Sequence, residues 1–302
     1  MNQRYIHPLI QELPFSPDAR TAIAEAMAQL DFPAAAEFQR LIRQYCANGY
    51  HYSSVKAQIP ALSQRCRIPA ESLNLLLLLS ASEDLRAAYR EARMPDGLFL
   101  ETMSDLCCKA EECFRVHGVY GCFVSNWYDK FFSLEILKLG RLEYEISSYP
   151  WAFSYEGHGL HLTQGMPVKN LHIPSGAPLS PADCLASYQK AYDFFRKDLI
   201  NGILVCVCRS WLLHKSTLTL LPAQGNTGRF IRSFQILQQE DQEEFHNGWR
   251  IFGAAHQNPP SELPEDTAMQ RAFKKHLCQG GTVGSGSGIL LFDGERVLTE
   301  KG

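Results

Sequence analysis

Two glutamates near the middle of the chain have the spacing of side chains that act together. Glu143 and Glu145 belong to the segment LKLGRLEYEIS (137–147), in which charged residues alternate with apolar ones. A period of two is typical of a β-strand, so both carboxylates are expected on one strand face. A carboxylate placed in this way removes a proton from a substrate amine, directly or through water. A salt-bridged, solvated strand face is the alternative interpretation.

A histidine and a serine lie at the ends of two further segments. His172 ends the alternating run VKNLHI (168–173), where an imidazole exchanges a proton near neutral pH. A hydrogen-bonded structural histidine is equally compatible with that position. Ser210 follows the apolar run ILVCVC (203–208), and its hydroxyl is expected to position a substrate or a leaving thiolate. We therefore treat both as candidate site residues.

The segment IPSGAPLSPADC (173–184) contains a candidate anion-binding site. Ser180, Pro181 and Asp183 have the spacing of a helix N-cap, a first helical residue and a capping partner. The first turn of a helix leaves backbone N–H groups unpaired, and such groups bind anions. Directly before it lie Ser175, Gly176 and Ala177, of which the glycine permits close approach of a ligand. A plain strand-to-helix turn is the alternative, because Pro178 and Pro181 each remove a donor.

The composition excludes several classes of protein. The 302 residues carry a net charge of -3, so bulk electrostatic binding to nucleic acid or an anionic membrane is not expected. The N-terminus has no apolar signal core. The longest apolar run, Leu75–Leu79, is too short to cross a bilayer and is expected in a buried helix. We expect a cytoplasmic protein.

The ten cysteines do not have the spacing of metal ligands. One cluster consists of Cys107, Cys108, Cys113 and Cys122, without the paired spacing of zinc ligands. We interpret these thiols, and those of Cys206 and Cys208, as reduced core residues. No metal site is expected.

Residues 1–128 show only helical patterns and are predicted to form a helical N-terminal domain. Ser16 and Pro17 have the order of an N-cap and a first helical residue. Helices are expected over 17–31, from Pro33 to about residue 48, and over 53–65, 69–93 and 97–116.

Residues 129–302 mix strand and helix patterns and are predicted to form a second domain. Strands are expected over 137–147, 158–163 and 168–173, as an antiparallel meander. A capped helix over 181–197 leads to the apolar run 203–208, which is typical of a central strand. The remaining expected elements are an outer strand (235–239), a helix (267–279), a flexible loop or bend (280–288) and a hairpin (289–298). The predicted fold class is mixed, α+β or α/β, with a central mixed β-sheet.

Several segments resemble a bacterial family of acyltransferase-domain proteins. They are LKLGRLEYE (137–145), LHIPSGAPLS (171–180), CRSWLL (208–213), NTGRFIRSF (226–234), and parts of 96–127. The resemblance spans nearly the whole chain. It implies a helical N-terminal domain and a C-terminal domain similar to GNAT N-acyltransferases.

This resemblance implies a substrate and a site. In GNAT folds acyl-CoA lies where two parallel strands separate, here 168–173 and 203–208. Ser175, Gly176 and Ala177 would then face the pyrophosphate of acyl-CoA or acetyl-CoA. Glu143 would be the base for an amine or amino-acid acceptor, with His172 and Ser210 lining the cleft.

Two departures from the GNAT pattern leave an alternative function open. The chain has S-G-A-P where GNAT enzymes have an arginine or glutamine followed by spaced glycines. It also lacks a tyrosine between residues 214 and 234, where the acid of those enzymes would lie. The alternative is a non-catalytic protein that uses the same fold to bind a small ligand or a partner protein.

Overall fold

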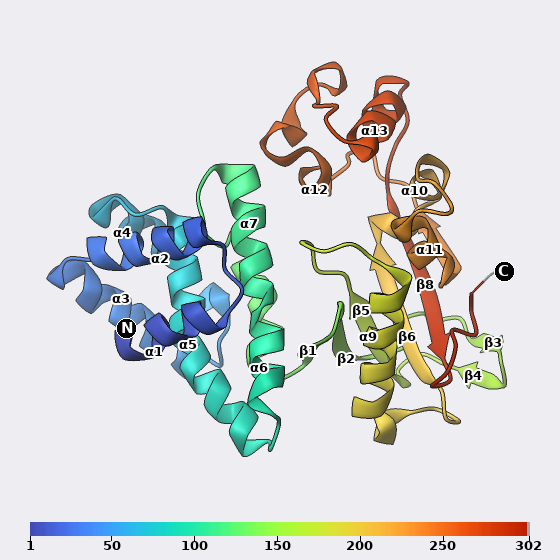
Figure 1. Ribbon diagram of the computed structural model, residues 1–302, viewed down its shortest axis with the longest axis horizontal. Coiled ribbons are helices and arrows are strands. Elements are labelled where there is room, and N and C mark those ends of the chain that lie inside the picture. The colour runs from blue at the N-terminus through green and yellow to red at the C-terminus, as the bar shows by residue number, and fades with distance from the viewer. Residues whose placement is uncertain (301–302) are drawn as a thin grey trace. The chain divides into compact units, whose positions relative to one another are not determined.

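Apolar residues at helical spacing make residues 3–132 a set of helices. The computed structural model describes residues 1–300, and the chain divides into two units, Met1–Leu137 and Lys138–Gly302 (Figure 1). The first unit contains α1 (Gln3–Glu12), α2 (Pro17–Gln29), α3 (Phe32–Ala47), α4 (Ile59–Cys66), α5 (Ala70–Glu91), α6 (Asp96–Met103), α7 (Asp105–His117) and α8 (Asp129–Phe132). The domain boundary expected between residues 128 and 129 stays a prediction.

The central helix of this unit is α5, whose leucines are its core. Leu75–Leu79 are all buried, as expected for a helix surrounded by α1, α2, α3, α4 and α6. The predicted cap of α2 is confirmed, because the Ser16 Oγ accepts the Ala19 N–H at 3.2 Å. The single helix predicted over 97–116 is wrong. It breaks at Ser104, whose hydroxyl donates to the Glu101 carbonyl oxygen at 2.6 Å and so competes with the helical pattern.

The second unit is built on a mixed six-stranded sheet of order β1-β2-β5-β6-β8-β7. Its strands are β1 (Ile136–Leu139), β2 (Leu142–Ser148), β5 (Pro167–His172), β6 (Leu204–Ser210), β7 (Gln235–Glu240) and β8 (Ser285–Phe292). Its longer helices are α9 (Pro181–Phe194), α10 (Lys215–Leu220), α11 (Asn226–Arg232) and α13 (Ala268–Cys278), with the short α12 (Trp249–Phe252). β5 and β6 pair in parallel, whereas β2–β5, β6–β8 and β7–β8 are antiparallel pairs. The predicted mixed fold class is confirmed.

Two predicted strand arrangements are wrong. Segment 137–147 is not one strand, because Gly140 adopts a positive φ of 79° and turns β1 into β2. The predicted meander is absent, because β2 pairs directly with β5. The intervening segment forms a separate hairpin of β3 (Tyr155–Gly157) and β4 (Leu160–Leu162).

The glycine-rich segment before the last strand is also not a flexible loop. Ser285–Gly288 belong to β8, and all eight residues of that strand are buried. A Cβ at Gly286 would lie 2.1 Å from the Leu213 carbonyl oxygen, and one at Gly284 would lie 1.8 Å from that of Glu240. The glycines are therefore needed for close packing of backbone against backbone.

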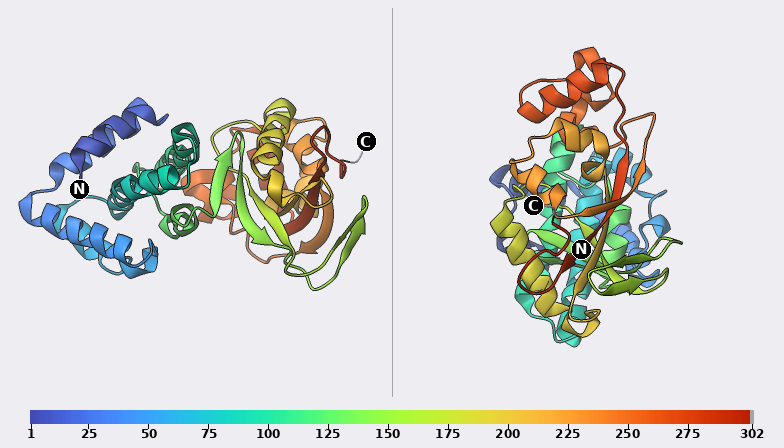
Figure 2. Two further views of the ribbon diagram at one scale, coloured as in Figure 1. Left: turned by 90° about the horizontal axis from the view of Figure 1, so that it is seen from below. Right: turned by 90° about the vertical axis from the view of Figure 1, so that its right-hand side faces the viewer.

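The two faces of the sheet have different coverings. Helix α9 packs on one face, where the Ser187 Oγ is hydrogen-bonded to the Leu142 N–H and the Tyr144 hydroxyl. The β3–β4 hairpin covers part of the other face over a cluster that includes Val168, Val205 and Leu291. Both views in Figure 2 have α9 and this hairpin on opposite sides of β8. We call the hairpin side the open face, because the hairpin covers only its apolar half.

Candidate functional site

The parallel strands β5 and β6 separate after a short contact. Their register has only two pairs, Lys169 with Cys206 and Asn170 with Val207. Beyond these pairs β5 continues to His172 and β6 to Ser210 without mutual pairing. Continued pairing would set His172 beside Arg209, so these two residues flank the split. The two strands therefore stop pairing within the sheet, before either of them ends.

The loop after β5 has the features of a seat for an anion. Gly176 has a φ of 94°, which lets the backbone turn toward a ligand. Within residues 1–300, the backbone N–H groups of Gly176 and Ala177 have no hydrogen-bond acceptor. The predicted cap that follows is confirmed, since the Ser180 Oγ accepts the Asp183 N–H at 3.1 Å. Free N–H groups and the start of α9 together favour negative charge.

Two further side chains shape this loop. The Arg141 guanidinium donates to the carbonyl oxygens of Ala177 at 2.7 Å and Pro178 at 3.1 Å, which fixes the loop and adds a positive charge. The Ser175 Oγ is buried and has no hydrogen-bond partner among the described residues. Such a hydroxyl is costly unless something pairs with it. The residues of the loop therefore fit a phosphate group.

A carboxylate, an imidazole and an amide meet on the open face beside the split. The His172 Nε2 lies 2.7 Å from the Glu145 Oε2, and the Asn170 Nδ2 lies 3.0 Å from the same oxygen. An ionised carboxylate only accepts hydrogen bonds, so it takes one from each neighbour. The Glu145 carboxylate therefore orients the His172 imidazole through Nε2.

Glu143 lies on the same face, opposite His172 in the β2–β5 register. The alternative interpretation of the two glutamates, a salt-bridged and solvated face, is wrong in its solvation, whereas the pairing of Glu145 with His172 agrees with it. Glu143 is 2% exposed and Glu145 is 5% exposed, whereas Ile146 on the other face of β2 is 51% exposed. Sequence alternation alone assigned the shared face correctly but not the burial, because the burial depends on β5 and on the rest of the fold.

Ser210 lies at the end of β6 on the other face of the sheet. Alternation along β6 sets it with Cys206 and Cys208, on the side of α9 and away from His172. Its Oγ accepts the Leu212 N–H at 3.2 Å, so its own O–H remains able to donate. The structure therefore brings Glu143 and His172 together and sets Ser210 on the opposite side of the same split.

A cavity of about 560 Å³ opens on the open face next to this group. Its lining includes Ser147, Asn170, Arg209, Glu240, Ser285 and Ser287. Asn170 also contacts Glu145 and His172, so it joins the cavity to the carboxylate–imidazole pair. The sequence patterns did not indicate Asn170 or the serines of β8. Only the alternation of serine with glycine in 284–288 signalled that small polar side chains share one face there.

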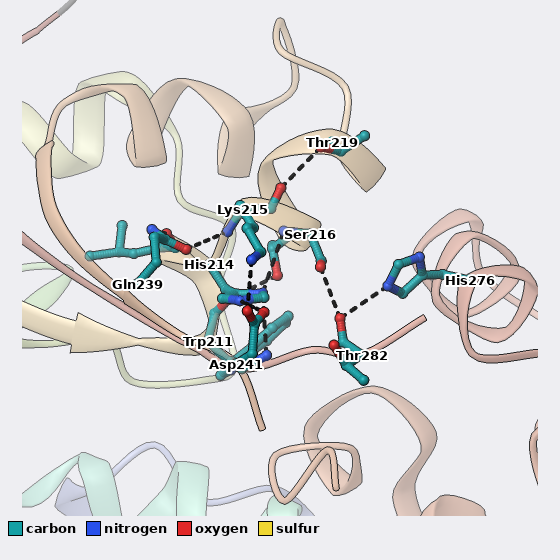
Figure 3. Close-up of polar contacts among 12 residues, drawn as sticks. Trp211, His214, Lys215, Ser216, Thr219, Gln239, Asp241, His276 and Thr282 are labelled. Carbon is teal, nitrogen blue, oxygen red and sulfur yellow. Dashed lines mark hydrogen bonds and ion pairs between the residues drawn. The ribbon is translucent and has the colours of Figure 1, made fainter. Parts of the chain in front are cut away.

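A second polar cluster surrounds His214 and holds the ends of β7 and β8 (Figure 3). The buried imidazole Nδ1 accepts the Gly284 N–H at 3.2 Å, and Nε2 lies 3.1 Å from the Asp241 Oδ1. His214 is therefore a neutral imidazole with its proton on Nε2, and burial lowers its pKa. Asp241 also accepts from the Lys215 Nζ at 2.7 Å. No lone pair of His214 is left for a substrate, so this cluster is structural.

Among residues 1–300, no group of three or more His, Cys, Asp or Glu side chains has the arrangement needed to hold a metal ion. No helix in that range combines the length and apolar character required to span a bilayer.

Two family models match the sequence in succession. Residues 5–134 match the model described as the N-acyltransferase N-terminal domain. Residues 136–290 match the model described as the GNAT-like C-terminal domain. No curated protein matches the sequence.

Several solved structures have a similar fold. An acyltransferase mutant in complex with octanoyl-CoA is 19% identical, with a TM-score of 0.73 over 96% of this chain and 88% of that chain. An acyltransferase in complex with CoA and 10C-teicoplanin is 18% identical, with a TM-score of 0.67 over 96% and 95% of the two chains. A complex with decanoyl-CoA and teicoplanin is 19% identical, with a TM-score of 0.65 and the same coverage. At these identities the likeness establishes the fold.

Proposed function

The chain belongs to the family that pairs an N-acyltransferase N-terminal domain with a GNAT-like C-terminal domain, and we propose that it transfers an acyl group from acyl-CoA to an amine. The observation that carries the proposal is the early end of β5–β6 pairing beside a loop with free N–H groups. Solved structures of similar fold hold octanoyl-CoA or decanoyl-CoA, which supports acyl-CoA as the co-substrate. Ten free cysteines favour a reducing compartment, the cytoplasm.

The residues around the split would hold acyl-CoA by its phosphates and its thioester. Ser175, Gly176 and Ala177 face the pyrophosphate, since their loop has free N–H groups and the Arg141 charge beside it. Acyl-CoA supplies an activated carbonyl carbon with a thiolate as the leaving group. The O–H of Ser210 is available to donate a hydrogen bond to that thiolate from the α9 side of the split.

The open face supplies the base. The amine nitrogen attacks the thioester carbon, the new C–N bond forms and the C–S bond breaks. The proton lost by the nitrogen passes to the imidazole of His172, which the Glu145 carboxylate orients through Nε2. Glu143 lies opposite His172 and stabilises the imidazolium that results. The acceptor is a small-molecule amine or an amino acid.

Ligand-induced stabilisation tests the first step. We expect acetyl-CoA, octanoyl-CoA or decanoyl-CoA to raise the melting temperature in a saturable way. The gain is about 2.7 kcal/mol at roughly 100 times the dissociation constant. Gly176→Ala should weaken the response at least tenfold in ligand concentration, because a side chain is strained at a φ of 94° and reduces access to the loop amides.

Gly159→Ala is the matched control for that variant. Gly159 also has a positive φ, 74°, but it lies in the β3–β4 turn with open space around it. Its substitution should lower stability without changing the response to acyl-CoA. An unchanged melting temperature of the wild type at millimolar acyl-CoA would reject the proposed function. Stabilisation without thiol release toward any amine would support the alternative of a non-catalytic binding protein.

A further inference from the structure

Three polar side chains form a row across the open face at the level of the split. Arg209 on β6 pairs in register with Ser287 on β8, and Ser287 pairs with Gln238 on β7. Residues directly opposite each other in antiparallel strands share a face, so all three point to the cavity that they line. A guanidinium, a hydroxyl and an amide together offer several hydrogen-bond donors.

Two serines of β8 line the cavity, Ser285 and Ser287. Ser285 is 8% exposed and Ser287 is 7% exposed. Each hydroxyl can donate one hydrogen bond, so both are suited to contact a polar ligand in the cavity. Their small size also leaves the space, since larger side chains at both positions would fill the cavity.

The charge at the rim of the cavity selects among polar ligands. Within residues 1–300 the Arg209 guanidinium is paired only with Glu240, and both side chains are more than half exposed. An exposed pair of this kind is weak and exchanges readily for a ligand. The planar fork of arginine matches a carboxylate, which takes two parallel hydrogen bonds. An alkyl chain is a poor occupant, because it would leave the serines and Arg209 without partners.

We propose that this cavity binds the acceptor, and that the acceptor is an amine bearing a carboxylate, such as an amino acid or a short peptide. Arg209 and Ser287 hold the carboxylate, and Gln238 borders it. The amine extends toward His172, which faces Arg209 across the split and is joined to the cavity by Asn170. This assignment rests on the proposed acyl transfer for its role, but the binding itself is measurable without acyl-CoA.

Direct binding of matched ligands tests the assignment. We expect the full-length protein to bind a free L-amino acid or dipeptide at least tenfold more tightly than the corresponding C-terminal carboxamide, as measured by calorimetry across a panel of side chains. Arg209→Gln should abolish this preference, because a charge-assisted hydrogen bond is lost. Ser287→Ala should reduce it severalfold.

Glu240→Gln should change the affinity for the carboxylate ligand in the opposite direction. It frees Arg209 and removes a negative charge from the rim, so the carboxylate ligand should bind severalfold more tightly. A purely structural ion pair would make Arg209→Gln and Glu240→Gln act in the same direction. Arg232→Gln, an exposed arginine on α11 outside the cavity lining, is the control and should leave both affinities unchanged.

The outcomes separate this inference from the proposed function. Equal affinity of wild type for acids and carboxamides, or an Arg209→Gln variant that keeps the preference, would overturn the carboxylate assignment even if acyl-CoA binds and turns over. A preference that depends on Arg209, in a protein that does not respond to acyl-CoA, would support the carboxylate site and reject acyl transfer. In a transfer assay, Arg209→Gln should raise KM for the acid acceptor and leave KM for acyl-CoA unchanged.

Discussion

At the scale of single residues, the proposed chemistry depends on how the His172 imidazole is oriented. Glu145 accepts from Nε2, and Asn170 donates to the same carboxylate, so both neighbours fix the ring in one orientation. A base that is held in place loses little entropy when substrate arrives. Asn170 and Glu145 are therefore positioning residues, whereas His172 and Glu143 are the proposed catalytic ones.

Substitution of these two side chains should affect turnover rather than binding. We expect His172→Gln to lower kcat by roughly 100-fold to 10,000-fold, as is usual for loss of a general base. Glu143→Gln should lower kcat less, because it removes only the charge beside the imidazolium. Neither variant should change the dissociation constant of acyl-CoA. Thiol release under saturating substrate and calorimetric titration of acyl-CoA measure the two quantities separately.

The exposed histidine of β4 is a matched control. His161 is in the same unit, with 61% of its side chain exposed, so His161→Gln should keep wild-type turnover. If His172→Gln turned over at the wild-type rate, another group would have to be the base. Equal losses in kcat and in acyl-CoA affinity would instead indicate a structural role.

Prediction of these residues from sequence succeeded only where the signal was local. The Ser180 cap lies within four residues of its partner, and such contacts follow from helix geometry. The contact between Glu145 and His172 spans 27 residues and exists because β2 and β5 pair directly. No spacing in the sequence records that pairing, so the partner of His172 was not predictable.

At the scale of elements, one helix serine fastens the turn that precedes the site. The Ser187 Oγ on α9 donates to the Leu139 carbonyl oxygen at 2.5 Å and accepts the Leu142 N–H at 3.2 Å. It thus joins both ends of the β1–β2 turn to α9, and Arg141 in that turn holds the loop that contains Ala177. The position of the proposed phosphate seat depends on this chain of contacts.

Ser187→Ala should therefore lower the free energy of unfolding by more than the loss of a single oxygen atom suggests. The substitution removes the hydroxyl that pairs with the carbonyl oxygen of Leu139 and the N–H of Leu142, two buried residues, which costs about 1–3 kcal/mol of unfolding free energy. Affinity for acyl-CoA should also fall, because the Arg141 contact to the loop is loosened. Urea denaturation and a thermal titration measure the two effects. Thr219→Ala is the control. Thr219 is exposed on α10 and its hydroxyl donates to the Lys215 carbonyl oxygen, so this substitution should lower the free energy of unfolding by less than about 0.5 kcal/mol.

Element prediction failed where a break depends on one residue in its tertiary setting. The alternation in 137–147 continues through Gly140, although the chain turns there against Ser187. The apolar face of 97–116 likewise continues through Ser104, where the helix breaks. The central strand β6 was predictable, because an unbroken apolar run bounded by polar residues has few other structures.

At the scale of the whole molecule, a buried imidazole makes the free energy of unfolding depend on pH. The pKa of His214 is lowered in the folded protein by burial, from an ordinary value of 6.5. Just below pH 6.5 His214 is protonated in the unfolded chain but neutral in the folded chain, so the free energy of unfolding falls as pH falls. Protonation would also remove the acceptor of the Gly284 N–H at the start of β8.

We expect the free energy of unfolding to decline between about pH 7 and pH 5, by at most about 1.4 kcal/mol per pH unit from this group. Carboxylates with lowered pKa values, such as Asp241 and Asp293, contribute only at lower pH. Urea denaturation at several pH values measures the slope. A His214→Gln variant should be less stable at pH 7 but should lose this slope. An identical slope in both proteins would assign the effect to other histidines.

The short contact between β5 and β6 also bears on the mechanics of the second unit. Its sheet consists of two three-stranded ribbons, β1-β2-β5 and β6-β8-β7, joined at a seam of two residue pairs. A seam of that length gives little resistance to shear, and α9 with the hairpin must supply most of the stiffness. A ligand that bonds to both ribbons would hold them together. The same end of pairing that is proposed to admit a substrate thus leaves the sheet weakly joined between β5 and β6.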